Sequence, residues 1–86
     1  MNNFGIKMSK IFLRENYEFI PDDSVWIEVK ILYEVYRKWI ISRGYGPCNI
    51  RVFGKAVRSV FPKMSKVRKG KIGKRVYVFE GVQEKI

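Results

Sequence analysis

The sequence predicts a small α+β domain of the winged helix-turn-helix class, with about three helices and a basic β-hairpin, the wing. The order of patterns along the chain predicts it: helix, helix, turn, basic helix and basic hairpin. The charge supports it, because the stretch Arg51–Arg75 holds ten basic residues and no acidic one, and accounts for the whole net charge of +10. A positive charge so confined favours a polyanionic partner, and we interpret the stretch as a nucleic-acid-binding surface.

The length and composition indicate one folded domain. A chain of 86 residues that is 47% hydrophobic and 15% aromatic is expected to form a single small core. We place this core at about residues 24–82, with an N-terminal helix and connection at 1–23. No run approaches the roughly 18 apolar residues that a membrane span needs, and the first ten residues lack the apolar h-region of a signal peptide. We therefore expect no membrane partner and a place in the cytosol or nucleoid, or in the nucleus of a eukaryote.

The residue inventory argues against catalysis. The chain has no histidine and a single cysteine, Cys48. These counts exclude an internal disulfide, a zinc site of the usual ligands and acid–base chemistry that depends on histidine. We expect no catalytic residue, no metal site and no cofactor, and predict that the protein is not an enzyme.

The N-terminal quarter is expected to hold one helix and a connection. Apolar residues within Ile6–Asn16 recur with helical spacing, which predicts a short helix packed on the rest of the chain. The segment Glu18–Asp23 is expected to be a connection. One of three residues is then expected to cap the next helix at its N-terminus: Asp22, Asp23 or Ser24.

A strong helical pattern covers Val25 to Arg43 and predicts a core helix rather than an aromatic binding platform. Gly44 stands where a C-capping glycine belongs, and the run Gly44–Pro47 cannot continue the helix. The apolar residues of the pattern recur at spacings of three and four: Trp26, Val29, Leu32, Tyr33, Tyr36, Trp39 and Ile40.

The next predicted helix, Ile50–Phe61, is amphipathic. Asn49 is its expected N-cap, and Pro62 ends it. Gly54 costs about 1 kcal/mol relative to alanine inside a helix, which predicts close packing against another backbone. The apolar side of this helix holds Phe53, Ala56, Val57, Val60 and Phe61, and the basic side holds Arg51, Lys55 and Arg58.

The last part of the chain predicts a hairpin. The arms Lys63–Lys69 and Lys74–Glu80 flank the turn Gly70–Gly73, and Val82–Ile86 is expected to be a short tail. The second arm alternates as a strand does, with Val76 and Val78 on one face and Tyr77 and Phe79 on the other.

We predict that DNA is bound by the basic side of the helix Ile50–Phe61 and by the hairpin. Three basic residues on a helix are by themselves an ordinary solvated face, but the neighbouring basic arms favour contact with phosphates or a groove. The predicted DNA-binding residues are Arg51, Lys55, Arg58, Lys63, Lys66, Arg68, Lys69, Lys71, Lys74 and Arg75.

The run FGKAVRSVFP at Phe53–Pro62 resembles the core of the RFX-type DNA-binding domain, a winged-helix family, and the resemblance covers some fifty residues, Ile31–Gly81. The resemblance implies that the wing enters the major groove while the recognition helix lies towards the minor groove. It assigns Lys55 and Arg58 to the helix contacts, and Lys66, Arg68, Lys69, Lys71, Lys74 and Arg75 to the wing. The matching residues are Leu32, Tyr33, Tyr36, Pro47, Asn49, Phe53–Gly54–Lys55, Arg58–Ser59–Val60–Phe61, Arg68, Gly70, Gly73, Tyr77 and Gly81.

The chain departs from that family in the wing. Val67 and Ile72 stand where RFX proteins carry arginine, and Val76 stands where they carry lysine. Arginine is the usual bidentate reader of guanine, so these departures predict a weak or different sequence preference. We expect random duplexes and an RFX-type site to bind within about tenfold of each other, or roughly 1.4 kcal/mol.

A second resemblance favours replication as the function. The runs FLRENYEF, LYEVYRKW and RVYVFEGV are similar to the C-terminal winged helix of phage and poxvirus primase–helicases. Our leading hypothesis is an accessory DNA-binding protein in replication by a phage, virus or mobile element, acting on duplex, single-stranded or forked DNA beside a primase, polymerase or helicase. The alternatives are an RFX-type transcription regulator and a protein-docking module anchored by Trp26 or Tyr45. A monomer is expected because no heptad pattern occurs.

Overall fold

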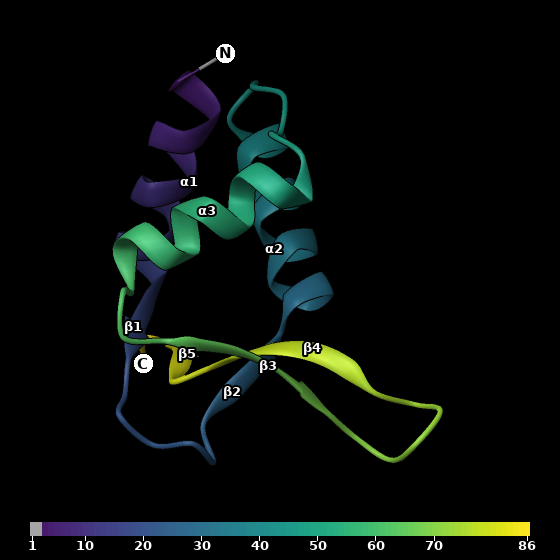
Figure 1. Ribbon diagram of the computed structural model, residues 1–86. Coiled ribbons are helices and arrows are strands. Elements are labelled where there is room, and N and C mark those ends of the chain that lie inside the picture. The colour runs from purple at the N-terminus through teal and green to yellow at the C-terminus, as the bar shows by residue number, and fades with distance from the viewer. Residues whose placement is uncertain (1–2) are drawn as a thin grey trace.

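The computed structural model describes residues 3–86 and places three helices above two small antiparallel sheets (Figure 1). This architecture confirms the predicted winged-helix class. None of the described helices is long and apolar enough to cross a membrane. The elements in chain order are α1 Asn3–Asn16, β1 Tyr17–Phe19, β2 Trp26–Glu28, α2 Val29–Ser42, α3 Ile50–Val60, β3 Ser65–Lys69, β4 Val76–Glu80 and β5 Val82–Glu84.

Two strands that the sequence did not predict join the segment after α1 to the C-terminal segment. β1 and β5 pair antiparallel, with Tyr17 opposite Glu84 and Phe19 opposite Val82. The expected connection at 18–23 therefore begins within a strand, and the expected tail at 82–86 is mostly a strand. Each strand has three residues, which is too short for a period of two to stand out in the sequence.

The wing belongs to a second sheet with strand order β2-β4-β3. Residues 25–28 were predicted to begin the helix, but 26–28 form β2 and pair with β4. Trp26 is consequently 46% exposed and not in the core.

None of the three candidate caps, Asp22, Asp23 and Ser24, reaches α2. Asp22 instead accepts hydrogen bonds from the backbone N–H and the hydroxyl of Ser24 (2.9 and 2.8 Å), and these bonds lower the pKa of Asp22 below its ordinary value.

The C-terminus of α2 ends as predicted. Gly44 adopts a positive φ of 84°, and its N–H donates to the carbonyl of Ile41 (2.9 Å). The N–H of Tyr45 donates to the carbonyl of Ile40 (3.2 Å). These two bonds form a Schellman motif, which favours glycine because an L side chain is strained at positive φ.

The amphipathic pattern of α3 is also confirmed. The Asn49 side chain accepts a hydrogen bond from the Val52 N–H (2.9 Å) and caps the helix. The apolar side faces the other helices, with Phe53, Ala56 and Val57 fully buried. The opposite side of α3 is left to solvent, and its basic residues are exposed.

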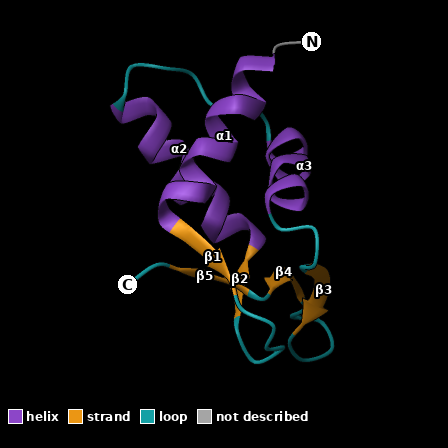
Figure 2. Cartoon of the chain, turned by 90° about the vertical axis from the view of Figure 1, so that its left-hand side faces the viewer, coloured by secondary structure: helices purple, strands orange, loops and turns teal. Residues whose placement is uncertain are grey.

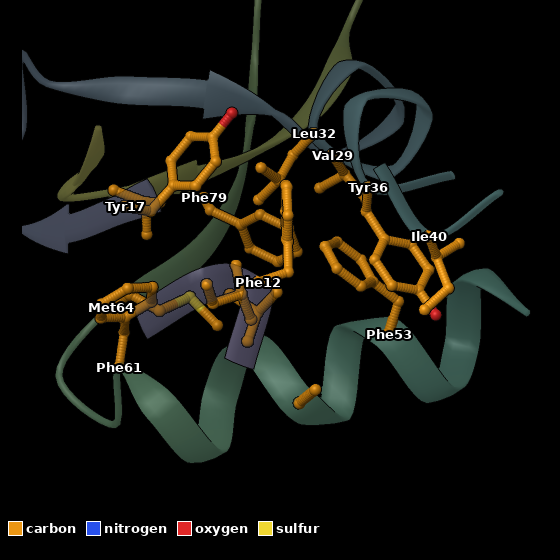
Figure 3. Packing of buried hydrophobic residues seen from close by; sticks show 14 residues of the cluster. Phe12, Tyr17, Val29, Leu32, Tyr36, Ile40, Phe53, Phe61, Met64 and Phe79 are labelled. Atoms are coloured by element: carbon orange, nitrogen blue, oxygen red, sulfur yellow. The ribbon is translucent and has the colours of Figure 1, made fainter. Parts of the chain in front are cut away.

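The core is centred on Phe12 of α1, which is 1% exposed (Figure 3). Its ring lies 5.3–6.4 Å, centroid to centroid, from four other aromatic rings contributed by β1, α2 and α3. One aromatic side chain thereby links four elements, and such pairs each add stabilisation beyond the area that they bury. The four partners are Tyr17, Tyr36, Trp39 and Phe53.

Two tyrosines of α2 fix the turn that leads into α3. The Tyr33 hydroxyl donates to the carbonyl oxygen of Cys48 (2.6 Å), and the Cys48 N–H donates to the Tyr36 hydroxyl (3.1 Å). The Tyr36 hydroxyl also donates to the Cys48 sulfur (3.3 Å), and its ring stacks on Phe53 at 4.6 Å. Burial raises the pKa of the Tyr36 phenol above its ordinary value, and the bond to sulfur adds to the rise.

We expect alkaline pH to destabilise the domain partly through Tyr36. A phenol whose folded-state pKa is raised contributes its full stabilisation below about pH 10 and loses it as the pH rises through the folded value. Tyr36→Phe removes this dependence and leaves the Cys48 N–H unpaired, at a cost of about 1–3 kcal/mol. Urea denaturation at neutral and alkaline pH should show a less stable variant whose stability declines less steeply. An equally steep decline in both proteins would show that Tyr36 does not contribute.

Candidate nucleic-acid interface

A groove of about 580 Å³ runs between α3, the start of α2 and the wing sheet. Figure 2 shows α3 and the β3–β4 hairpin on the same side of the molecule. Among the described residues that line the groove, Glu28 alone is acidic. The basic lining residues come from α2, α3 and the wing: Lys30, Arg51, Lys55, Arg58, Lys66, Arg68 and Arg75.

The wall formed by α3 presents its basic side to this groove. Arg51, Lys55 and Arg58 all line it, as the helical period predicted. Gly54 lies among them, and a Cβ built at this position would meet nothing within 4 Å. The prediction that Gly54 packs closely against another backbone is therefore wrong. Gly54 lies on the side of α3 that lines the groove, where the absence of a side chain leaves space next to the helix backbone.

The opposite wall is formed by the wing, and strand register decides which wing residues face α3. Lys66 pairs with Phe79, and Arg68 pairs with Tyr77. Directly opposite residues of an antiparallel pair point to the same face, and Phe79 is buried in the core below the helices. Lys66 and Arg68 therefore face the groove.

Tyr77 organises these two cations. The Lys66 ammonium lies 5.1 Å and the Arg68 guanidinium 5.6 Å from the centre of its ring. Both distances are within the roughly 6 Å over which a cation is attracted to an aromatic face. The ring is about half exposed, so it orders two positive groups without burying them.

Comparison with known proteins identifies the family. The family model described as the RFX DNA-binding domain matches residues 6–86. The chain belongs to this family. A curated relative, DNA-binding protein RFX7 of Xenopus laevis, is 31% identical over 74 residues, which are 86% of this chain and 5% of that protein. The chain thus spans a small part of the relative's length. Family membership confirms DNA binding through a winged helix and a non-catalytic role.

Six of the ten predicted DNA-binding residues line the groove of this RFX domain: Arg51, Lys55, Arg58, Lys66, Arg68 and Arg75. Sequence reasoning did not select two further residues of the groove. Lys30 falls between the apolar residues of the predicted helix Val25–Arg43, and it reaches the groove because that helix begins only after β2. Tyr77 was assigned only to a strand face, and its contacts with two cations depend on the pairing of β3 with β4.

Two of the remaining predicted residues lie away from the groove. The Lys69 ammonium forms an ion pair with the Glu80 carboxylate at 3.0 Å, and both side chains are more than half buried. It also lies 6.0 Å from the Trp26 ring. Lys63 borders a separate hollow together with Asp22, Asp23 and Glu80. Nearby carboxylates reduce the positive potential at both lysines.

The last two predicted residues, Lys71 and Lys74, lie at the tip of the wing, which projects beyond the rest of the RFX domain (Figure 1). The Lys74 N–H donates to the Lys71 carbonyl (2.8 Å) and closes a β-turn. Gly70 adopts a φ of 116°, and a Cβ there would lie 2.7 Å from the Lys74 carbonyl oxygen. The start of the tip therefore requires glycine.

Burial along β4 does not alternate as expected. Val78 and Phe79 are both buried, whereas Val76 and Tyr77 are both exposed. The reason is that β2 pairs only with residues 78–80 of β4. The strand has neighbours on both sides at that end, while its first half extends into the wing with β3 alone.

We expect Arg58→Ala to weaken DNA binding without altering the fold. Its side chain is exposed, and surface substitutions usually change stability by less than about 0.5 kcal/mol. If Arg58 contacts one phosphate, the slope of log K against log salt should fall by about 0.9. Lys38→Ala is the matched control, because Lys38 is an exposed cation of α2 outside the groove. Fluorescence polarisation and thermal melting check both variants. Equal effects of the two substitutions on affinity would argue against the groove.

We expect some lysines of the wing to contribute to DNA affinity and another to contribute to the stability of the fold. Changing Lys71 and Lys74 together to alanine should reduce affinity and lower the salt slope by up to about 1.8, since both lie in the turn between β3 and β4. Lys69→Ala should instead lower the melting temperature, because it leaves Glu80 without its ion-pair partner. A flattened salt slope for Lys69→Ala with unchanged stability would reverse this assignment.

Proposed function

We propose that this RFX domain is the DNA-reading module of a transcription regulator and binds duplex DNA with its basic groove and wing. The observation that carries the proposal is the convergence of seven basic side chains from three elements around one groove with a single acidic residue among its described lining. Positive groups converging from several elements match the regular phosphate charge of a duplex. The site of action would be the nucleus in a eukaryote or the nucleoid in a bacterium.

The shape and chemistry of the groove favour duplex over single-stranded DNA. Proteins that bind single strands stack successive bases on exposed aromatic rings. The described groove lining has two aromatic residues, Tyr77 and Phe79. Phe79 is buried, and the Tyr77 ring is already close to two protein cations. A helix and a two-stranded ribbon, in contrast, are both elements that a major groove admits.

Membership of the RFX family favours a regulator over the replication module that the primase–helicase resemblance suggested. A regulator must discriminate between sequences, which requires contacts with base edges. Four arginines line the groove, and each has the forked donors that read guanine. These four arginines are base-reading groups at positions other than 67 and 72. We therefore expect more discrimination between DNA sequences than the absence of arginine at those two wing positions predicts.

Selection from a random duplex pool at physiological salt tests the proposal. We expect an information-rich consensus that binds more than about tenfold tighter than a shuffled duplex, or roughly 1.4 kcal/mol. Arg58→Ala should degrade the consensus at the base pairs that Arg58 reads, whereas Lys38→Ala should return the unaltered consensus. The proposal fails if no consensus emerges and duplex, single-stranded and forked DNA bind equally well. That result would support the replication hypothesis.

A further inference from the structure

The tip of the wing carries an isoleucine that the protein itself does not bury. Ile72 is 89% exposed, and among the described large hydrophobic residues only the C-terminal Ile86 is more exposed. Its loop otherwise consists of glycine, lysine and arginine from Gly70 to Arg75. Removing an apolar side chain from water is favourable. A partner that covers the tip would therefore gain binding free energy by burying Ile72.

The turn holds Ile72 in a defined position. It is the second residue of the β-turn closed by the hydrogen bond from the Lys74 N–H to the Lys71 carbonyl (2.8 Å). The third residue, Gly73, has a φ of 85°, as a type II turn requires. Presentation on a closed turn lowers the entropy that the loop loses on binding.

The neighbours of Ile72 indicate which partner would cover it. Lys71, Lys74 and Arg75 are all exposed, so an apolar protein surface would have to desolvate or exclude these charges. A nucleic acid pairs with them. The tip is the end of a two-stranded ribbon, which the major groove of B-DNA admits at its width of about 12 Å, whereas the minor groove, at about 6 Å, would have to be widened.

We propose that Ile72 is a specificity-determining residue that packs against the C5 methyl group of a thymine in the major groove. The base edges in that groove are otherwise donors and acceptors, and the thymine methyl is their apolar feature. The lysines on either side would hold the tip through phosphates while Ile72 selects A·T pairs. The inference rests on the proposed duplex binding and adds to it the identity of a base that the wing tip prefers.

The test uses two duplexes that differ only in this methyl group. The first is the best binder selected from the random pool, and the second is the same duplex with every thymine replaced by deoxyuridine. Loss of one buried methyl contact should weaken binding of the original protein about fourfold. Ile72→Ala should bind the thymine duplex about fourfold more weakly and should no longer distinguish the two duplexes. Ile41→Ala is the matched control, because Ile41 is an exposed isoleucine of α2 outside the groove.

The outcomes distinguish this inference from the proposed function. The inference is supported if the original protein and Ile41→Ala prefer thymine and Ile72→Ala does not. Equal preference in all three proteins, or equal affinity of the original protein for both duplexes, overturns it while duplex binding stands. Weaker binding of Ile72→Ala to both duplexes by the same factor would also overturn it, since it indicates a methyl-independent contact. Failure of the original protein to bind duplex DNA at all would instead refute the proposed function.

Discussion

The hydrogen bonds between two tyrosines of α2 and Cys48 determine where α3, the helix with the basic side, lies. The Tyr33 hydroxyl satisfies the carbonyl of Cys48, and the Tyr36 hydroxyl satisfies its N–H, one residue before the N-cap of α3. Because the Tyr36 ring also stacks on Phe53, the start of α3 and its buried side are held by a single residue of α2. The buried side of α3 fixes the opposite side, so the direction of the basic face is a consequence of packing in the core.

The same elements form the aromatic core with one side and line the basic groove with the other. Phe12 gathers rings from β1, α2 and α3, and Phe79 brings β4 to the same cluster. The next groove-facing residue of β4 is Tyr77, where two cations collect. Since like charges around one groove repel each other, the core must hold α3 and the wing in place against that repulsion. DNA would neutralise it.

The three helices, the start of α3 and the end of α2 could be predicted because their signals are local. The apolar period of α3, the capping side chain of Asn49 and the glycine after α2 each act within one or two turns of helix. The β3–β4 hairpin could also be predicted, but the pairing of β1 with β5 and of β2 with β4 could not, because it joins residues up to 67 positions apart, as between Tyr17 and Glu84. The same limit applied to the site. Lys63 and Lys69 were selected for their charge and their place in the hairpin, and only the fold places carboxylates near them. Gly54 was misjudged because helix propensity does not say which side of a helix is covered.

The pairing of β1 with β5 has a consequence for the way this domain is made. The strand that completes the smaller sheet comes from residues 82–84 and pairs with residues 17–19, and the N–H of Lys85 donates to the carbonyl of Asn16 at the end of α1 (2.9 Å). Contacts of such long range close late, because the whole intervening chain must first be available. During synthesis the helices can collapse around Phe12 while still emerging from the ribosome, but the sheet closes only after residues 82–85 are free. From the topology we expect the helical core to form first and the β1–β5 pair to close last.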